Sequence, residues 1–170
     1  MEQIQIAGEF IRQSAYRIEE NTPRIKKCLH QLTDEEVWLK PNASSNSIAN
    51  LVLHLCGNIT QYIISSIGGK PDMRVRDLEF SATRWFSRDQ LLDKMSTTAN
   101  DATAIIKNTN EKELLRIRQV QGFSLTGIGI IIHVTEHYSY HTGQIALITK
   151  LLKDRDLAFY GGIDLNKKNG

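Results

Sequence analysis

Apolar residues recur at helical spacing in four long segments, which predicts four main helices. The first segment, 4–32, continues its apolar pattern on both sides of Pro23. Proline lacks the amide hydrogen that bonds back four residues, so either the helix is kinked at Pro23 or a new helix begins there with Thr22 as its cap. We favour the kink. Thr33 and Glu36 have the spacing of a capping box, which predicts a short helical turn before Pro41.

The second helix is predicted to begin near Ser47, after the polar loop 42–47, and to end at Gly68 and Gly69. Apolar residues cover more than half of its circumference, so we expect it to pack against neighbours on two sides. A polar stripe interrupts this apolar surface at Asn50, His54, Asn58 and Gln61. Buried polar groups cost stability unless they have partners, and a metal ion would supply a partner for His54.

A long charged connection follows the second helix, and a capping box at Ser87 and Gln90 marks the start of the third helix. Such a long connection is unusual inside a compact domain, so we expect it to lie over an opening or to change the order of the helices. Residues 113–123 alternate poorly between apolar and polar types. They predict an extended or irregular link with room for a short strand.

The fourth helix is predicted to run from Ser124 or Thr126 to about Leu152, a length of ~40 Å. Beyond it we expect the aromatic pair Phe159-Tyr160 to dock on the domain and the last few residues to fray. The whole pattern predicts an all-α fold, a four-helix bundle with a long crossover between helices two and three. A chain of 170 residues is long enough for one core and too short for two, so we expect a single domain over 1–170.

Composition narrows the class of protein. Apolar residues make up 41% of the chain and charged residues 24%, without an apolar run long enough to span a bilayer. The first residues resemble neither a basic leader nor a signal core, which predicts a cytoplasmic location. Cys28 and Cys56 are too few for a disulfide framework and are expected to be free thiols. A net charge of +2, with basic and acidic residues interspersed, argues against nucleic-acid binding.

Three of the five histidines stand four residues apart, at His133, His137 and His141. On a helix they form a column on one face, and adjacent members can bind one metal ion. All three together span about 12 Å, too far to share one ion, so a further ligand should come from another element. His54 is the obvious supplier, because His30 ends a different amphipathic segment. Three ordinary core or surface histidines remain the alternative.

These residues resemble the DinB-like superfamily of bacterial proteins, which includes YfiT-type proteins assigned as metal-dependent hydrolases. The blocks 46–58 and 136–145 look like two signature blocks of a small branch of that superfamily, and Glu79-Phe80 and Phe159-Tyr160 look similar to other recurring positions there. The resemblance covers nearly the whole chain. It implies a helical bundle, frequent homodimers packed through helices, and a nickel or zinc ion. By position, the ligands it implies are His54, His137 and His141, which leaves open whether His133 touches the metal.

Two rival motifs receive less weight. Residues 133–137 spell His-x-x-Glu-His, an inverted zinc-protease pattern in which the glutamate activates water. That motif belongs to larger proteases and would leave His54 and His141 unexplained. Four arginines in and after the crossover could bind an anion, although charges in a connection are usually only solvated: Arg74, Arg76, Arg84 and Arg88.

Two functions from different classes follow. The first is a metal-dependent hydrolase or thiol transferase that acts on a small molecule or a low-molecular-weight thiol. The second is a binding or stress-response module with a structural metal. Three neutral histidines favour the enzyme, because a closed structural zinc site usually has four ligands, often thiolates, and Cys56 points away from His54.

Further side chains are predicted to serve the site. Three amides could orient the substrate or support the ligands: Asn58, Gln61 and Gln144. No carboxylate is assigned to the pocket itself, which leaves Glu136 and His133 as outside candidates for a general base.

Overall fold

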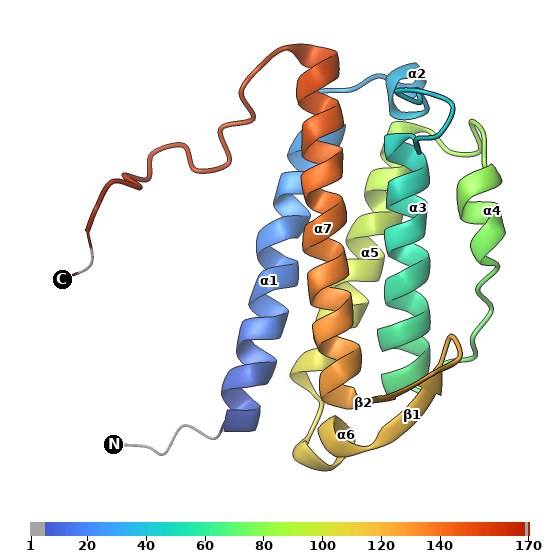
Figure 1. Ribbon diagram of the computed structural model, residues 1–170, viewed down its shortest axis with the longest axis vertical. Helices are drawn as coiled ribbons and strands as arrows, with labels where there is room; N and C mark the ends of the chain where they lie inside the picture. Colours follow the sequence, from blue (N-terminus) through green and yellow to red (C-terminus); the bar gives the residue numbers. More distant parts are fainter. Residues whose placement is uncertain (1–5, 169) are drawn as a thin grey trace.

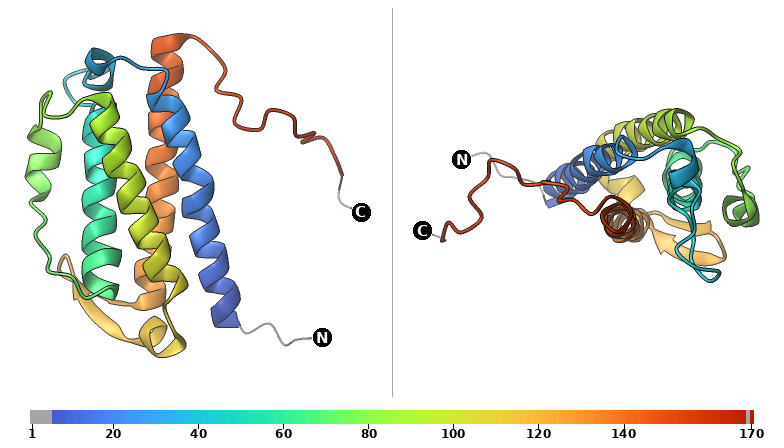
Figure 2. Two further views of the ribbon diagram at one scale, coloured as in Figure 1. Left: turned by 180° about the vertical axis from the view of Figure 1, so that it is seen from behind. Right: turned by 90° about the horizontal axis from the view of Figure 1, so that it is seen from above.

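The computed structural model describes residues 6–168 and 170, and four long helices lie side by side in it (Figure 1). They are α1 (Ile6–Leu29), α3 (Ile48–Ile59) with its continuation η1 (Thr60–Ile67), α5 (Arg88–Lys107) and α7 (Gly127–Lys153). α1 packs on α5 and α7, and α3 packs on the same two helices. Seen from above, the helices surround a common core (Figure 2). The predicted helical class is therefore confirmed for most of the chain.

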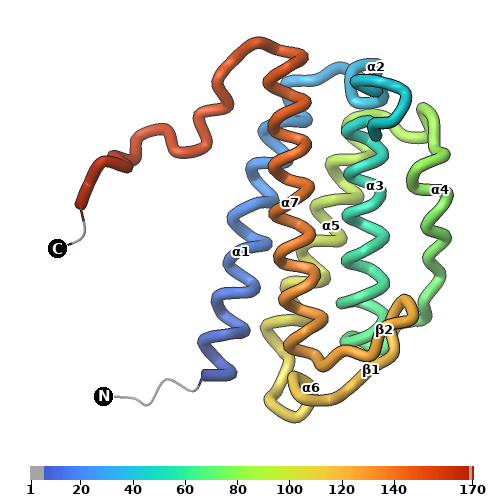
Figure 3. Tube along the Cα trace, viewed as in Figure 1, coloured from blue at the N-terminus to red at the C-terminus, as the bar shows by residue number. Residues whose placement is uncertain are grey.

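The direction of the helices explains the long crossover. α3 and α5 are neighbours that run the same way, whereas α1 and α7 run the opposite way (Figure 3). No tight turn can join two parallel neighbours, so the chain must return along the full length of α3 before α5 begins. The return path contains a short helix, α4 (Arg76–Ser81), that packs on α3. The connection that the sequence predicted as a charged crossover thus has a helix of its own.

α1 continues through Pro23 as one helix, so the alternative of a new helix beginning there is wrong. In the turn before the proline, the Thr22 hydroxyl donates to the Ile18 carbonyl at 2.7 Å. The predicted start of this helix near Ile4 lies outside the described residues. The short helix α2 (Asp34–Val37) follows, and both reciprocal bonds of the predicted capping box between Thr33 and Glu36 are present.

α3 begins as predicted, with Ser47 as its cap and a reciprocal bond from Asn50. Nearly every residue of α3 is buried, because neighbours cover it on more than one side. The chain then changes from α-helical to π-helical geometry at Thr60, which the apolar pattern did not reveal. Gly68 and Gly69 end the segment, and Gly69 has a positive φ of 72° that favours glycine.

A hairpin replaces most of the irregular link expected over 113–123. After helix α6 (Glu111–Leu115), strand β1 (Ile117–Val120) pairs antiparallel with β2 (Phe123–Thr126). Gln121 and Gly122 form the turn with φ values of 50° and 82°, which suit a two-residue hairpin. Thr126 then caps α7 by accepting a hydrogen bond from the amide of Gly129. The hairpin closes one end of the helical array (Figure 1).

The segment after α7 returns to α1 through its aromatic pair. Leu157 is buried, and the Arg24 guanidinium donates to the Tyr160 hydroxyl at 3.0 Å, so the expected docking is observed. Asn169, within the end expected to fray, lies outside the described residues. Both cysteines are free, as predicted, and burial raises the pKa of the Cys56 thiol to about 11. Within residues 6–168, no helix is long and apolar enough to cross a membrane.

Candidate metal centre

Three histidines from two helices converge between α3 and α7. The Nε2 atoms of His54 and His137 lie 2.9 Å apart, and one ring nitrogen each from His54, His137 and His141 all lie within 4.8 Å of one another. His54 and His141 are 7% and 8% exposed, and His137 is half-buried. α3 packs on α7, and this contact brings together His54 and His137, which are 83 positions apart in sequence.

Hydrogen bonds at Nδ1 determine which ring nitrogen of His54 and of His141 remains free to bind a metal. His54 Nδ1 lies 2.9 Å from Oε2 of Glu79, and His141 Nδ1 lies 2.6 Å from Oε1 of Gln144. A carboxylate only accepts hydrogen bonds, so Nδ1 of His54 donates to Glu79; Nη2 of Arg74 also lies 3.3 Å from this nitrogen but donates to the nearer Oε2 of Glu79, at 2.9 Å. The amide oxygen of Gln144 likewise requires that Nδ1 of His141 donates. Each ring therefore carries its proton on Nδ1 and keeps a bare lone pair on Nε2. This is the arrangement in which imidazole binds a metal.

Glu79 reaches His54 from the crossover helix and is held there by an arginine. Arg74 binds the Glu79 carboxylate with two nitrogens, at 2.7 and 2.9 Å, and its own side chain is only 3% exposed. Arg74 also donates to Gln61 at 2.9 Å, and Gln61 donates to Asp72 at 2.8 Å. Burial opposes ionisation of Glu79, but hydrogen bonds from Arg74 and His54 outweigh it and lower the pKa of the carboxyl group. Glu79 is therefore a buried carboxylate anion.

Gly57 makes room for this carboxylate on α3. A Cβ atom built at Gly57 would lie 1.9 Å from Oε1 of Glu79 and 3.0 Å from Nε of Arg74. Any side chain at position 57 would displace the ion pair from His54. Glycine is unfavourable in the middle of a helix, so its presence here is explained by the close approach of Glu79.

The protonation states of the histidines suit a cation. Burial, together with the neighbouring His141 and His54, lowers the pKa of His137 to about 3. Burial also lowers the pKa of His141. Both rings are therefore neutral at physiological pH and can donate a nitrogen lone pair. The donor set fits a divalent transition-metal ion, which accepts imidazole readily.

Comparison with known proteins gives the family of the chain. The model of a family described as "Protein of unknown function (DUF1572)" matches residues 5–161. The chain belongs to the DUF1572 family. No curated protein matches it. A DinB-like protein from Bacillus subtilis superposes with a TM-score of 0.68 at 19% identity, covering 87% of this chain and 96% of that one.

Two further solved structures have the same fold. A DinB-like protein from Bacillus cereus gives a TM-score of 0.64 at 17% identity, covering 84% of this chain and 90% of that one. A conserved protein from Enterococcus faecalis gives 0.69 at 14% identity, with coverage of 85% and 97%. The resemblance to the DinB-like superfamily is thus confirmed, at the level of the fold.

His133 of this DUF1572 protein supports the trio from one side and is not part of it. Its Nε2 atom lies 3.2 Å from Nδ2 of Asn58, and its ring stacks on Tyr62 with centroids 4.4 Å apart. The Asn58 amide donates to Nε2 of His133, so the lone pair of this ring nitrogen is already used in a hydrogen bond. His133 also stacks on His137 at 5.4 Å, and this contact limits how the His137 ring can turn.

The three amides that the sequence singled out contact different parts of the site. Gln144 contacts one of the three clustered histidines directly, at Nδ1 of His141. Asn58 contacts His133, and its Oδ1 atom is buried without a hydrogen-bond partner among the described residues. Gln61 hydrogen-bonds to Arg74, which in turn binds the carboxylate that contacts His54. Gln61 therefore supports the ion pair and does not face the histidines.

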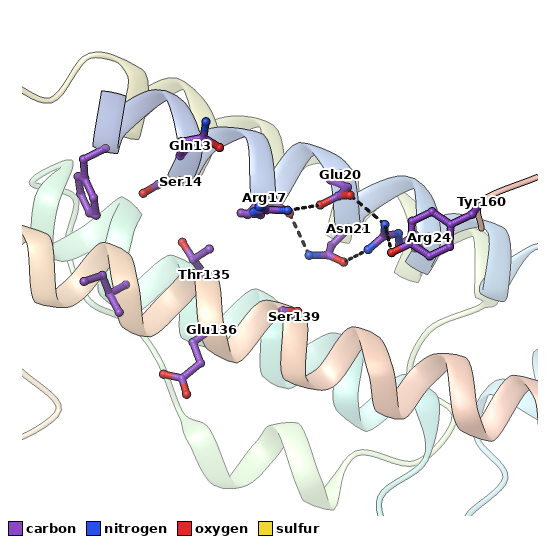
Figure 4. Close-up of a pocket in the computed structure, with 12 residues that line it drawn as sticks. Gln13, Ser14, Arg17, Glu20, Asn21, Arg24, Thr135, Glu136, Ser139 and Tyr160 are labelled. Atoms are coloured by element: carbon purple, nitrogen blue, oxygen red, sulfur yellow. Dashed lines mark hydrogen bonds and ion pairs between the residues drawn. The ribbon is translucent and has the colours of Figure 1, made fainter. Parts of the chain in front are cut away.

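The sequence assigned no carboxylate to the pocket and did not single out Glu79 as a partner of His54. Glu79 lies at hydrogen-bond distance from His54. Its only sequence signal was the Glu79-Phe80 pair in the branch resemblance, on a short stretch where apolar and acidic residues alternate. The predicted alternative, Glu136, is exposed and has no hydrogen bond to a histidine within the described part of the chain. It lines a groove of about 580 Å³ between α1 and α7, beside Thr135 and Ser139 (Figure 4).

The four arginines do not form one anion-binding cluster. Arg74 is buried against Glu79, and Arg76 lies over the ring of Phe80 at 4.7 Å. Arg88 pairs with Asp89 and donates its amide to Asp34. Arg84 lies in a turn with a φ of 54°. The arginine that matters at the site is Arg74, and its partner is a carboxylate of the same chain.

Proposed function

We propose that this DUF1572 protein binds a divalent metal ion, nickel or zinc, through Nε2 of His54, His137 and His141. The observation that carries the proposal is the pair of Nδ1 hydrogen bonds, to Glu79 and Gln144, which leave lone pairs directed into one small space. Without an ion, two imidazole nitrogens 2.9 Å apart can coexist only if one of them carries a proton. A shared cation could take the place of that proton.

We further propose that the metal site is catalytic, with a hydrolase or a thiol transferase as the two candidates. A bound divalent ion supplies Lewis-acid activation of water or of a thiol at neutral pH. Three protein ligands leave a coordination position for such a group, whereas closed structural zinc sites have four. The chain's own residues would orient the ligands, through Glu79 and Gln144, and limit rotation of His137, through His133. The substrate on this proposal is a small molecule or a low-molecular-weight thiol.

The alternative is a binding module in which the metal is structural. The burial of His54 and His141 favours it, because an ion there would have limited contact with solvent. The two functions differ in one measurable property. A catalytic ion exchanges its solvent-facing ligand with added anions or thiols and a structural ion does not. Absorption spectra of the cobalt-substituted protein, with and without a small thiol, distinguish them.

Metal titration and a substrate screen test the proposal. Calorimetric titration of Zn²⁺ and Ni²⁺ into the wild type should give one site per chain, and His54→Ala and His137→Ala should abolish it. His30→Ala is the matched control, because His30 is exposed at the end of α1 and should leave binding unchanged. The loaded proteins are then compared on ester, amide and thiol-transfer substrates. Activity that survives loss of the ion contradicts the catalytic proposal, and inactivity of the loaded wild type on all substrates favours the binding module.

A homodimer is part of the same proposal, since the superfamily resemblance implies it. Four exposed apolar residues of α7 fall within one third of its circumference at 100° per residue: Ile132, Tyr140, Leu147 and Leu151. A partner could cover this strip. Light scattering across the micromolar range measures the mass, and a monomer at all concentrations contradicts the dimer.

A further inference from the structure

The crossover between η1 and α5 is attached at three positions along α3 and its continuation η1. The Asn50 side chain donates to the carbonyl oxygens of Glu79 and Ala82, at 2.9 and 3.1 Å. The Glu79 carboxylate contacts His54 one turn further along. Gln61 binds Asp72 and Arg74 near the start of the crossover. The polar stripe of α3 therefore has two partners: α7 at the histidines and the crossover along the rest.

The histidine at the centre of this arrangement belongs to both sets of contacts. Nε2 of His54 faces His137, and Nδ1 of the same ring faces Glu79. A single imidazole thus separates the metal position from a buried ion pair. Whatever changes the electron demand at Nε2 also changes the strength of the hydrogen bond at Nδ1, because the two nitrogens share one aromatic ring.

We propose that Glu79, held by Arg74, is a positioning residue for the metal site, and that metal binding and attachment of residues 72–79 to α3 stabilise each other. This rests on the proposed metal binding of His54, His137 and His141. Glu79 fixes the His54 ring in the tautomer and orientation that direct Nε2 toward α7. Arg74 holds Glu79 in place, through two hydrogen bonds at 2.7 and 2.9 Å.

The charges explain why the ion should favour this attachment. The Arg74–Glu79 pair is neutral as a whole, so a divalent ion would bring uncompensated positive charge into a mostly buried space. The Oε2 atom of Glu79 is the negatively charged group in hydrogen-bond contact with a proposed ligand. A ligating imidazole becomes a stronger hydrogen-bond donor at its other nitrogen, so the bond to Glu79 tightens when Nε2 binds.

The crossover depends on these side-chain contacts for its own order. Residues 70–75 have neither helical nor strand structure, and Met73 and Val75 are 82% and 58% exposed. Arg74, between them, is the side chain that turns inward, with 3% of its surface exposed. Few apolar contacts therefore hold this stretch, and loss of the Glu79 bond to His54 should loosen it. By thermodynamic linkage, the free energy by which the ion stabilises attachment of the crossover equals the free energy by which that attachment stabilises ion binding.

Metal affinity is the first test. Zn²⁺ is titrated against a chromogenic chelator with wild type, Glu79→Gln, and the control Glu113→Gln. Glu113→Gln also removes the carboxylate partner of a largely buried arginine, Arg118. Glu113 is far from the three histidines in sequence. Glu79→Gln should weaken Zn²⁺ binding about 10- to 100-fold, the usual effect of losing such a partner, and Glu113→Gln should leave it unchanged. Equal affinity of Glu79→Gln and wild type overturns the inference.

Hydrogen exchange of residues 70–82 is the second test, and it does not depend on activity. Zn²⁺ should slow exchange of these amides in wild type and in Glu113→Gln, and should have little effect on them in Glu79→Gln. If the wild type binds Zn²⁺ but hydrogen exchange of residues 70–82 does not change, the proposed coupling is wrong, while the proposed metal site stands. A wild type that binds neither Zn²⁺ nor Ni²⁺ overturns the proposed function itself.

A folding control keeps the result interpretable. Glu79→Gln leaves the Arg74 charge buried without its partner, which can destabilise the protein strongly. The double variant Arg74→Gln/Glu79→Gln removes both charges together. If the single variant does not fold, the double variant is measured in its place, with the same expected loss of affinity and the same contradictory outcome.

Discussion

The carboxylate of Glu79 lies against α3 at Gly57, where an added Cβ would come within 1.9 Å of Oε1. Gly57→Ala should therefore displace Glu79 and Arg74 and destabilise the protein by about 1–3 kcal/mol, the usual cost of overpacking. It should also weaken metal binding. Urea unfolding measures the first effect and a Zn²⁺ titration the second.

Gly143→Ala is the matched control for this substitution. Gly143 lies in the interior of α7, and its Cβ would meet nothing within 4 Å. Alanine there should stabilise the helix by up to about 1 kcal/mol. If Gly57→Ala is stabilising to the same degree as Gly143→Ala, the close approach of Glu79 to α3 is wrong.

Gln144→Leu should release the His141 ring from its fixed tautomer, because the Nδ1 proton loses its acceptor. We expect Zn²⁺ affinity to fall about 10-fold or more. Nitrogen NMR of the metal-free protein reports the tautomer directly. The wild type should show His141 with its proton on Nδ1, and the variant should show a mixture. Gln13→Leu, on α1, is the control and should change neither quantity.

Acid should destabilise the metal-free protein through His137. Its pKa is lowered from 6.5 to about 3 by burial and the neighbouring histidines, so the unfolded chain binds a proton that the folded protein does not. The contribution of His137 to stability is complete above the unfolded pKa of about 6.5 and is lost as the pH falls toward 3. His137→Asn should therefore lose less in Tm than the wild type between about pH 7 and pH 5, in the presence of a chelator. Parallel curves would argue against a neutral His137.

Tyr138→Phe tests the contact between α1 and α7 that lies beside the histidines. The Tyr138 hydroxyl lies 2.8 Å from the Thr22 hydroxyl, which itself donates to Ile18. The Tyr138 hydroxyl also lies 3.4 Å from Sδ of Met95, and Thr22 keeps the Ile18 carbonyl as a partner when that hydroxyl is lost. We expect a cost of about 1 kcal/mol in the free energy of unfolding. Tyr16→Phe, at an exposed position of α1, should change stability by less than about 0.5 kcal/mol.

The helices and the histidine column follow directly from the sequence, because helical periodicity is a local property. Apolar spacing places the long helices, and spacing of four places His137 and His141 on one face. The capping boxes at Thr33, Ser47 and Ser87 mark helix starts, since each depends on two residues three positions apart. Interactions within one turn of a helix are visible in sequence.

The partners of the polar stripe are not visible in this way. Buried polar side chains predicted that α3 needs partners, but the partner of Asn50 is the crossover backbone and that of Gln61 is Arg74. Glu79 meets His54 across 25 residues, and only the return path of the crossover along α3 brings them together. The change to π-helical geometry at Thr60 likewise depends on packing and has no marker in the apolar pattern.

The separation of the histidines along the chain gives a bound ion a mechanical consequence. An ion shared by His54 and His137 would join two points 83 residues apart and enclose the crossover, α5 and the hairpin in one loop. It would act as a reversible cross-link, since the loop cannot open until the ion leaves. Free ion at a hundredfold excess over its dissociation constant adds about 2.7 kcal/mol to the free energy of unfolding. The supply of metal would then shift the balance between folded and unfolded molecules.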